Sequence, residues 1–504
     1  MMNVLIIFGA SGDLTSRKII PALFQLFSEK KLPKPFAVIG ISRTRFTSAE
    51  WRKQLKASIQ KTMKDPDFSR DWDQFESIIH YFSGDVKNPE MFFELNCFIK
   101  EIQKENGEKN AEIVYYLAVA PILYTQIIQN FEKTGLAAKD FPDKYGIILE
   151  KPFGMDRQSA EDLNRQLHSV FQENQIFRID HYLGKETVNN IFALRFANTI
   201  FEPLWNRDYI EHIQITVNES LPVGRRGPFY ESTGILRDMF QNHLLQLLSI
   251  TAMEPPAQFD AKFVRDEKVK VLRSIRKSKY EIEKNMVYGQ YVKYREEQGV
   301  HPDSLVPTFI ALRLFIDNWR WKGVPFYLRS GKSMSCQTSQ ILIQYKKPPH
   351  WIFENEIQRK REKSSSDPEG NSLLIQIQPS EGIRLNFLSK VPGTIMLFQN
   401  SELTFSFGNY GKNKLPEAYQ RLLLDVFSGD PSLFARNDEV EAAWDIIDPF
   451  QNYIDSAIRR NISIPLYESG SWGPSASDLW MQKQGRTWLN LCPIIDRPEK
   501  NGSY

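Results

Sequence analysis

The order of apolar and polar positions divides the chain into two parts. In the first part, continuous apolar runs alternate with segments of helical spacing, and the runs are VLIIF (4–8), FAVIGIS (36–42), IVYYLAV (113–119) and YGIIL (145–149). Short apolar runs of this kind are typical of strands that are buried on both faces of a parallel sheet. Strand alternating with helix up to about residue 180 therefore predicts a Rossmann-type, doubly wound α/β domain.

Beyond residue 200 the period of the pattern changes to two. Ile213, Ile215 and Val217 alternate with polar neighbours, and the segments 310–314, 383–387 and 403–407 repeat the alternation. Period two is typical of half-exposed antiparallel strands. With helices expected at 235–252 and 415–427, we predict an α+β part built on one large, mainly antiparallel sheet. The predicted domains are 1–180 for nucleotide binding, and 181–504 for substrate binding and dimerisation.

Two further segments of the pattern give local expectations. The stretch TSAEWRKQLKASIQ (47–60) reads as a helix capped by Thr47 or Ser48, since hydroxyl side chains satisfy the first free N–H groups. The stretch ENEIQRKREKSSSDPEGN (354–371) is polar and is expected to form a loop.

Composition and charge exclude several classes of protein. The chain has 504 residues, of which 41% are hydrophobic and 25% charged, as in ordinary globular proteins. Its 64 basic and 61 acidic side chains give a net charge of +3, so it lacks the global field of a nucleic-acid or membrane-surface binder. If the protein binds anions selectively, the positive charge that does so must be concentrated in one part of its surface.

The cysteines and the N-terminus bear on the compartment. Cys97, Cys336 and Cys492 are odd in number, far apart and without metal-ligand spacing, which predicts free thiols, a reducing compartment and no metal site. The apolar run that ends at Phe8 is too short for a signal peptide, and no later segment approaches the length of a membrane span. We therefore expect a cytoplasmic protein.

The stretch FGASGDLTSRK (8–18) follows the first predicted strand and leads into a helix. Strand, glycine turn and helix form the geometry in which backbone N–H groups and a helix N-terminus bind a phosphate. The spacing Gly9-x-x-Gly12 departs from G-x-G-x-x-G, and an ordinary turn also favours glycine, but the position after the first strand favours a dinucleotide. A P-loop is excluded, because Gly331-Lys332-Ser333 has Phe326 where that motif requires glycine.

The end of the second strand bears on which dinucleotide is bound. It ends in Gly40-Ile41-Ser42-Arg43, without the carboxylate that would bind the ribose hydroxyl of NAD. The guanidinium of Arg43 can hold a 2′-phosphate, so NADP is preferred, with a solvated surface arginine as the alternative.

Candidate substrate residues lie in two motifs after later strands. EKPFG (150–154) places Lys151 at a strand end, where open α/β sheets bind ligands, although a lysine at an ordinary turn would look the same. RIDHYLGKE (178–186) brings together Asp180, His181, Tyr182 and Lys185. A cation, an imidazole and a phenol match the acceptors of a phosphate ester, while a polar domain junction would explain the charge alone.

A histidine lies in the helical segment GILRDMFQNHLLQLLSI (234–250). His243 shares the apolar stripe of this helix, which by itself favours a core histidine over a catalytic base. Asp238, Asn242 and Gln246 on the adjoining face favour the second interpretation, because a polar strip beside the histidine is typical of one edge of a cleft.

At this point the chain resembles the glucose-6-phosphate dehydrogenase family along nearly its whole length. The motifs that carry the resemblance occur in the family's order: GASGDL, EKPFG, RIDHYLGKE, RDMFQNHLLQ, PFYLRSGK, AYQRLLLDVFSGDPSLFARNDEVEAAW and ESGSWGP. Of these, RIDHYLGKE is the specific signature.

The resemblance implies oxidation of glucose 6-phosphate at C1 to 6-phosphogluconolactone, with NADP as the hydride acceptor. It further implies His243 as general base, oriented by Asp180. The substrate residues that it implies are Lys151, His181, Tyr182, Lys185, Glu219, Asp238 and Lys332, with Gln337 standing where the family usually has a basic residue. The NADP residues that it implies are Gly9, Ala10, Ser11, Gly12, Asp13, Leu14, Thr15, Ser16, Arg43, Asp85, Val86, Tyr124 and Lys151.

The resemblance also implies a homodimer or larger homo-oligomer formed through the second-domain sheet. For a second, structural NADP site, only Arg329 lies in a matching context. Two alternatives stay open from the residues: an oxidoreductase of the inositol or glucose-fructose type, which would not need the phosphate cluster at 181–185, and a catalytically silent NADP sensor, which would be expected to lack the base or its partner.

Overall fold

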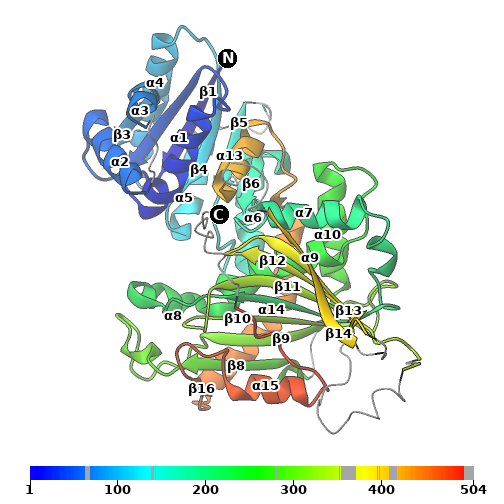
Figure 1. Cartoon of the computed structure of the whole chain (residues 1–504). Coiled ribbons are helices and arrows are strands. Elements are labelled where there is room, and N and C mark those ends of the chain that lie inside the picture. The colour runs from blue at the N-terminus through cyan, green and yellow to red at the C-terminus, as the bar shows by residue number, and fades with distance from the viewer. Residues whose placement is uncertain are drawn as a thin grey trace, which may run out of the picture. The chain divides into compact units, whose positions relative to one another are not determined.

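The computed structural model of the chain (Figure 1) describes residues 1–62, 68–137, 141, 144–277, 281–350, 352–353, 370–393, 396, 398–407 and 417–492. Residues 354–369 of the expected polar loop lie outside these ranges. The chain forms two compact units, each discontinuous in sequence. Unit 1 comprises 1–185, 256–266 and 416–441, and unit 2 comprises 186–255, 267–415 and 442–504.

Unit 1 is built on a seven-stranded sheet, which confirms the predicted parallel α/β architecture. The strand order is β15-β6-β5-β4-β1-β2-β3, and every neighbouring pair is parallel except β15 with β6. The strands are β1 (Met2–Phe8), β2 (Phe36–Ser42), β3 (Ile79–Ser83), β4 (Ala111–Leu117), β5 (Tyr145–Leu149), β6 (Ile176–Ile179) and β15 (Phe434–Ala435).

Helices pack against this sheet (Figure 1) and bury its aliphatic strands. A π-helical turn, η1 (Thr15–Ile19), leads into the first of them. The helices are α1 (Ile20–Ser28), α2 (Ser48–Thr62), α3 (Phe68–Phe75), α4 (Pro89–Glu105), α5 (Tyr124–Thr134), α6 (Arg157–Val170) and α13 (Ala418–Phe427). Thr47 caps α2, because its hydroxyl accepts from Glu50 N and the Glu50 carboxylate accepts from Thr47 N in return.

Unit 2 contains a nine-stranded sheet that is mainly antiparallel, as predicted. The order is β14-β13-β12-β11-β7-β10-β9-β8-β16, with parallel pairing only between β10 and β7 and between β16 and β8 among the described strands. The strands are β7 (Ile210–Asn218), β8 (Met286–Tyr291), β9 (Phe309–Phe315), β10 (Pro325–Gly331), β11 (Thr338–Tyr345), β12 (Ser372–Gln378), β13 (Gly382–Lys390), β14 (Phe398–Ser406) and β16 (Leu466–Tyr467).

The expectation of a half-exposed strand at 212–217 is wrong. The polar residues His212, Gln214 and Thr216 of β7 are buried along with the aliphatic ones. They are buried because residues 487–489 pack on this face: Gln214 donates to Thr487 O at 2.8 Å and accepts from Leu489 N at 2.9 Å. In β13 and β14 the side chains of both faces are half-buried or exposed, so the expected alternation of buried and exposed positions is absent there too.

The helical segment predicted at 235–252 is present, but half of it is a π-helix. Helix α8 (Gly227–Ile235) ends where Gly234 takes φ +64°, then η7 (Leu236–Leu244) has π geometry, and α9 (Leu245–Ala252) completes the segment. Other helices in or entering unit 2 are α7 (Glu186–Phe196), α10 (Ala261–Ser274), α11 (Ile282–Asn285), α14 (Asn437–Arg459) and α15 (Ser475–Gln482). Among the described helices, none has the length and apolar character of a bilayer span.

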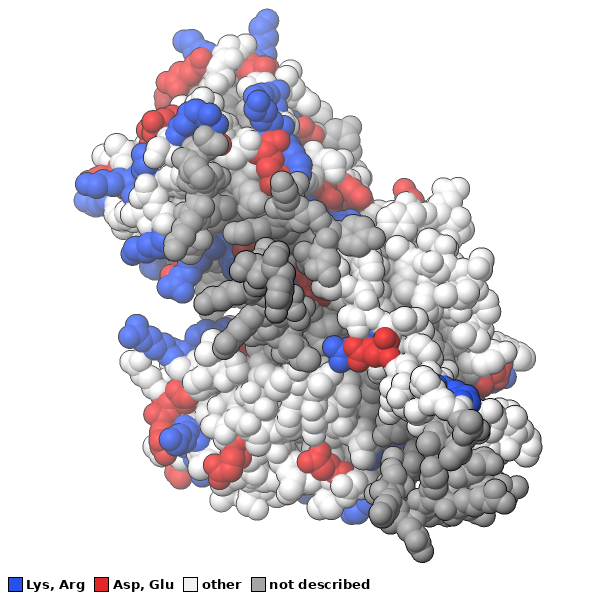
Figure 2. Space-filling model, viewed as in Figure 1, with Lys and Arg blue, Asp and Glu red and all other residues white. Residues whose placement is uncertain are grey.

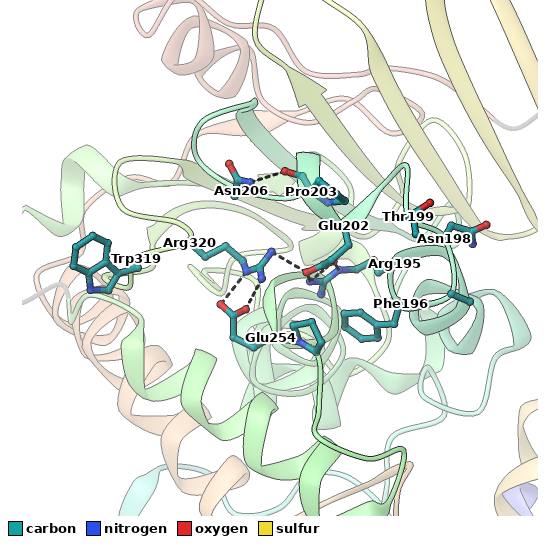
Figure 3. A pocket seen from close by; sticks show the side chains of 12 residues that line it. Arg195, Phe196, Asn198, Thr199, Glu202, Pro203, Asn206, Glu254, Trp319 and Arg320 are labelled. Atoms are coloured by element: carbon teal, nitrogen blue, oxygen red, sulfur yellow. Dashed lines mark hydrogen bonds and ion pairs between the residues drawn. The ribbon is translucent and has the colours of Figure 1, made fainter.

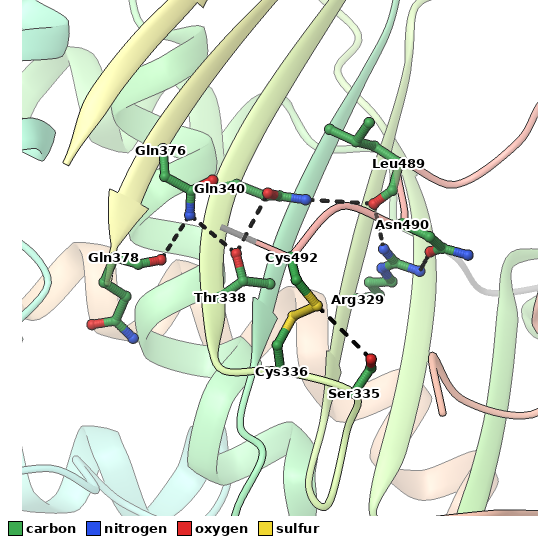
Figure 4. Close-up of a disulfide and its surroundings, with 10 residues drawn as sticks. All are labelled: Arg329, Ser335, Cys336, Thr338, Gln340, Gln376, Gln378, Leu489, Asn490 and Cys492. Atoms are coloured by element: carbon green, nitrogen blue, oxygen red, sulfur yellow. Dashed lines mark hydrogen bonds between the residues drawn. A yellow bond between two sulfur atoms is a disulfide. The ribbon is translucent and has the colours of Figure 1, made fainter. Parts of the chain in front are cut away.

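The prediction that all three cysteines are free thiols is wrong. Cys336 and Cys492 form a disulfide (Figure 4), while Cys97 is free and exposed. The two bonded cysteines are 156 positions apart in sequence. They meet because the chain after α15 returns across the sheet to the loop between β10 and β11, which no local spacing could reveal.

Candidate functional site

The carboxyl ends of the central strands of unit 1 form the expected nucleotide edge. The strand order reverses between β1 and β4, and open α/β sheets bind ligands outside such a reversal. Gly9 follows β1 there with φ +96°, and a Cβ on it would lie 2.3 Å from Ala118 O. Only glycine therefore permits the turn after β1 to pass this close to the end of β4.

The turn itself is held by its own hydrogen bonds. Gly12 N and the Thr15 hydroxyl both donate to Gly9 O at 3.0 Å, and the indole of Trp51 donates to Ala10 O at 3.2 Å. Ser11 and Asp13 are exposed at the tip, where the helical residues begin at Asp13. A fixed turn with exposed groups at a helix start has the geometry that binds a pyrophosphate.

Arg43 lies beside this turn. It follows β2 and is exposed, and the neighbouring Thr44 hydroxyl donates to Ser11 Oγ at 3.3 Å. Among the described residues, Arg43 has no ion-pair partner. An unpaired guanidinium beside a phosphate turn fits a dinucleotide with an additional phosphate on its ribose.

The other nucleotide candidates, Asp85, Val86 and Tyr124, follow β3 and β4 at the same edge of the sheet. The Asp85 carboxylate accepts from Lys87 N at 3.0 Å, and Val86 O accepts from the amide of Asn130 at 3.3 Å. Tyr124 is buried, and its hydroxyl lies 3.2 Å from Glu150 O. Burial raises the pKa of Tyr124, which therefore remains a neutral donor.

Lys151 follows β5, next to a buried carboxylate that the sequence did not single out. Glu150 accepts from Tyr116 at 2.6 Å and from Tyr419 at 3.1 Å. Burial raises the pKa of Glu150, and the charge of Asp180 adds to this effect, while both phenols and Lys151 oppose it. Glu150 is thus in electrostatic contact with two candidate site residues, and its place in EKPFG was its only sequence signal.

The RIDHYLGKE motif forms a compact turn after β6. The buried carboxylate of Asp180 accepts from Tyr182 N at 3.0 Å. The ring of Tyr182 lies 5.0 Å from that of His181 and 5.1 Å from Lys185 Nζ. The turn packs tightly on α13, since a Cβ at Gly184 would lie 2.6 Å from Ala418 O. The imidazole, phenol and ammonium are therefore presented as one group of donors.

In unit 2, the buried Lys332 is at the centre of an ionic cluster with Asp238, which is buried, and Glu219, which is half-buried. Lys332 follows β10, is 1% exposed, and places Nζ 2.6 Å from Glu219 Oε2 and 2.8 Å from Asp238 Oδ2. Burial lowers the pKa of Lys332, but the two carboxylates outweigh burial and hold it above the usual value. Lys332 thus contacts two residues that lie 113 and 94 positions before it in the chain. The family resemblance implied all three as residues that contact the sugar hydroxyls or the phosphate.

Two tyrosines support Lys332, and neither was identified from the sequence. Tyr230 is buried, with its ring centroid 5.6 Å from Lys332 Nζ. Tyr467 donates to Lys332 O at 2.7 Å, just before the motif ESGSWGP. No periodicity distinguishes these tyrosines from other core aromatics, since their role depends on contacts between distant segments.

His243 lies on the π-helix η7 and is buried. In a π-helix the backbone hydrogen bonds join residues five apart, as Asp238 and His243 are, instead of four apart as in an α-helix. Gln337 is exposed in the loop before β11. Lys151, Asp180, His181, Tyr182 and Lys185 belong to unit 1, and Glu219, Asp238, His243, Lys332 and Gln337 belong to unit 2.

A cavity of about 790 Å³ in unit 2 lies apart from these residues (Figure 3). Its charged side chains bind one another: Arg320 is paired with Glu254 and Glu202, and Arg195 with Glu202 at 3.1 Å. Arg195 also donates to two backbone carbonyls at the end of α9. This network links α7, the end of α9 and the loop that carries Arg320. Because its charged groups already bind one another, we assign the cavity no ligand.

The fold and the site define an oxidoreductase with a dinucleotide-binding unit and a second, α+β unit. Two family models cover nearly the whole chain: the NAD-binding domain of glucose-6-phosphate dehydrogenase over residues 6–190, and its C-terminal domain over residues 192–489. The chain belongs to the glucose-6-phosphate dehydrogenase family.

Individual relatives agree with this assignment. Glucose-6-phosphate 1-dehydrogenase of Aggregatibacter actinomycetemcomitans is 41% identical over an alignment of 495 positions that covers 96% of this chain and 96% of that one. A solved glucose-6-phosphate dehydrogenase in complex with its substrate glucose 6-phosphate has a TM-score of 0.87 at 33% identity, over 96% of this chain and 98% of that one. The enzyme from Mycobacterium avium has a TM-score of 0.81 at 34% identity, over 97% of this chain and all of that one.

Proposed function

We propose that this protein oxidises glucose 6-phosphate at C1 to 6-phosphoglucono-1,5-lactone, the first step of the oxidative pentose phosphate pathway. The observation that carries the proposal is the Lys332 cluster with Glu219 and Asp238, next to the histidine-bearing helix η7, in a chain of this family. A buried cation with one buried and one half-buried carboxylate offers both donors and acceptors to the hydroxyl groups of a sugar.

We propose NADP as the cofactor, because Arg43 stands where an NAD-specific site has a carboxylate. The dinucleotide would lie along the turn from Gly9 to Ser16, with Asp85, Val86, Tyr124 and Lys151 around it. When bound, its nicotinamide supplies the hydride acceptor. The protein contributes placement and electrostatics.

In the proposed mechanism, His243 accepts the proton of the C1 hydroxyl. A histidine side chain with the ordinary pKa of about 6.5 can accept a proton in this way at neutral pH. Asp180 would fix the tautomer of His243 and stabilise the imidazolium. His181, Tyr182 and Lys185 would bind the 6-phosphate, with Gln337 as a further contact. Binding at the phosphate is remote from C1, so it contributes to positioning the reacting carbon.

A direct assay tests the proposal. Reduction of the dinucleotide is followed at 340 nm with glucose 6-phosphate or glucose, and with NADP or NAD. We expect turnover with the phosphorylated sugar and preference for NADP. Equal turnover of free glucose would favour an enzyme of the inositol or glucose-fructose type, and binding of NADP without any turnover would favour a sensor.

The variant His243→Asn tests the base. We expect turnover to fall by about 10²- to 10⁴-fold while NADP binding, measured by calorimetry, survives. His301→Asn is the control, since His301 is an exposed histidine of unit 2. Unchanged turnover in His243→Asn would remove His243 from the mechanism.

We also propose a homodimer or larger homo-oligomer formed through the sheet of unit 2. The apolar residues Leu403 and Phe405 of β14 are 61% and 40% exposed. Opposite them on β13 lie Leu385 and Ile383, so these side chains share one face of the sheet. Figure 2 shows extended uncharged surface in the part of the view that holds this sheet, as an interface would need.

A further inference from the structure

Arg43, the candidate contact for the 2′-phosphate of NADP, lies between two residues that share one buried support. Arg43 is exposed in the loop between β2 and α2, with Ser42 before it and Thr44 after it. Both neighbours form hydrogen bonds with the side chain of Tyr81, which lies on β3 and is 6% exposed. One side chain thus holds the backbone on both sides of Arg43.

The hydrogen bonds around Arg43 form a closed cycle. The phenol of Tyr81 donates to Thr44 O at 2.7 Å and so accepts from the Ser42 hydroxyl, whose oxygen is 2.6 Å away. Ser42 Oγ in turn accepts from Thr44 N at 3.2 Å. Burial raises the pKa of Tyr81, and the bond with Ser42 only partly opposes this, so the phenol stays protonated at neutral pH. The cycle therefore fixes both backbone groups of Thr44, next to Arg43.

The aromatic ring of Tyr81 has a different set of contacts from its hydroxyl. The ring centroid lies 5.3 Å from that of Trp51 and 5.6 Å from that of Phe46. Trp51 fills the space beside Gly40, the partner of Tyr81 in the sheet, and its indole donates to Ala10 O in the phosphate turn. The ring thus supports the turn that both dinucleotides would use, whereas the hydroxyl contacts only the loop of Arg43 among the described residues.

The other side-chain bonds to Thr44 are weaker. The Thr44 hydroxyl donates to Ser11 Oγ at 3.3 Å, and the Ser83 hydroxyl donates to Thr44 O at 3.4 Å. Both bonds are long and exposed, so water competes for the same groups. The position of Thr44, and with it that of Arg43, therefore depends mainly on the Tyr81 hydroxyl.

We propose that Tyr81 is a positioning residue for Arg43 and, through it, a determinant of the preference for NADP over NAD. Its hydroxyl keeps the guanidinium where it meets the 2′-phosphate. NAD has no such phosphate, so its binding does not depend on that position. This inference rests on the proposed use of NADP, since it explains how the same site would discriminate between the two dinucleotides.

The variant Tyr81→Phe tests the inference, because it removes the hydroxyl and keeps the ring. Calorimetric titration of the full chain with NADP and with NAD gives both values of Kd, and the assay at 340 nm gives kcat. We expect Kd for NADP to rise about three- to tenfold, because the loop position that binds the phosphate becomes only partly populated. The Kd for NAD, and kcat with either dinucleotide, should stay within about twofold of the parent values.

A double-mutant cycle tests whether the hydroxyl acts through Arg43. In the Arg43→Ala background, Tyr81→Phe should change Kd for NADP by less than about twofold, because the group that the phenol positions is gone. Ser42→Ala opens the hydrogen-bond cycle at another point and should raise Kd for NADP in the parent background. Tyr145→Phe is the matched control, since Tyr145 begins β5 at the opposite edge of the same sheet, and it should bind both dinucleotides as the parent does.

Three results would overturn the inference: unchanged NADP binding in Tyr81→Phe, an equal loss for NADP and NAD, or a loss that persists in full in the Arg43→Ala background. A parent chain that binds both dinucleotides equally would overturn the proposed use of NADP and this inference with it. Absence of turnover with glucose 6-phosphate would overturn the proposed reaction alone, because the calorimetric test of Tyr81 needs no turnover.

Discussion

At the residue scale, charge balance suggests which part of the substrate the Lys332 cluster meets. With Glu219 and Asp238 ionised, the cluster has one ammonium for two carboxylates. A net negative cluster disfavours a phosphate dianion and favours hydroxyl groups, which both donate and accept. The donors of the 181–185 turn are the better match for the phosphate. We therefore propose that Lys332 and its partners contact the sugar ring.

Arg43 gives a prediction at the same scale. The variant Arg43→Ala should weaken NADP binding by about 10- to 100-fold, because a charge-assisted hydrogen bond to the 2′-phosphate is lost. Binding of NAD should change little. Calorimetric titration with both dinucleotides measures the difference.

Arg45→Ala provides the control, since Arg45 is likewise exposed and lies two residues further along the same loop. An equal loss for NADP and NAD in Arg43→Ala would mean that the 2′-phosphate is held elsewhere.

At the scale of elements, the strand before Asp180 is fixed by one buried ion pair. Arg178 on β6 is 1% exposed and lies 2.6 Å from Glu173, whose carboxylate also accepts from Asn437 N at 3.0 Å. Burial acts to raise the pKa of Glu173, but Arg178, His168 and Asn437 together lower it to about 2. The pair joins β6 to the start of α14 and thereby fixes the turn that carries the candidate phosphate residues.

Glu173→Gln tests this pair through the pH dependence of stability. The pKa of Glu173 is lower in the folded chain than the ordinary ~4.3, so its contribution is complete above that pH and is lost as the pH falls toward 2. We expect the variant to lose about 2–3 kcal/mol at pH 7 and to show a smaller further loss on acidification.

Denaturant unfolding at pH 7 and at pH 3–4 measures both effects. The matched control is Glu161→Gln, which removes a more exposed pair with Arg157 and should cost less than about 1 kcal/mol. A parallel fall in stability with pH for Glu173→Gln and the parent would refute the assignment.

The π-helix η7 is the other feature at this scale. Apolar spacing predicted its helical character, but hydrogen bonding over five residues changes which side chains share a face. Every residue from Asp238 to Leu244 is buried, including the polar residues Asp238 and Asn242 of the strip expected beside His243.

At the scale of the whole molecule, the sheet of unit 2 gives a prediction about assembly. Leu403→Glu places a charge on the apolar face formed with β13, and should raise the dimer dissociation constant by at least about tenfold. Sedimentation velocity over a range of concentrations measures this change.

Thr404→Glu is its control, because Thr404 is exposed on the opposite face of the same strand. A parent chain that is monomeric at all concentrations, or equal dissociation in both variants, would contradict an interface on this face.

The sequence by itself determined the two-part architecture, the glycine turn and the identity of most candidate site residues. It could do so because strand burial, helix spacing and turn conformation are local properties, and because Lys151, Asp180 and His243 lie in contiguous motifs. Only the tertiary structure decided what depends on distant segments: the contact of Lys332 with Glu219 and Asp238, the support from Tyr230 and Tyr467, the burial of β7 and the disulfide. These are contacts between residues far apart in the chain, and their formation depends on how whole elements pack, which no local pattern of residues encodes.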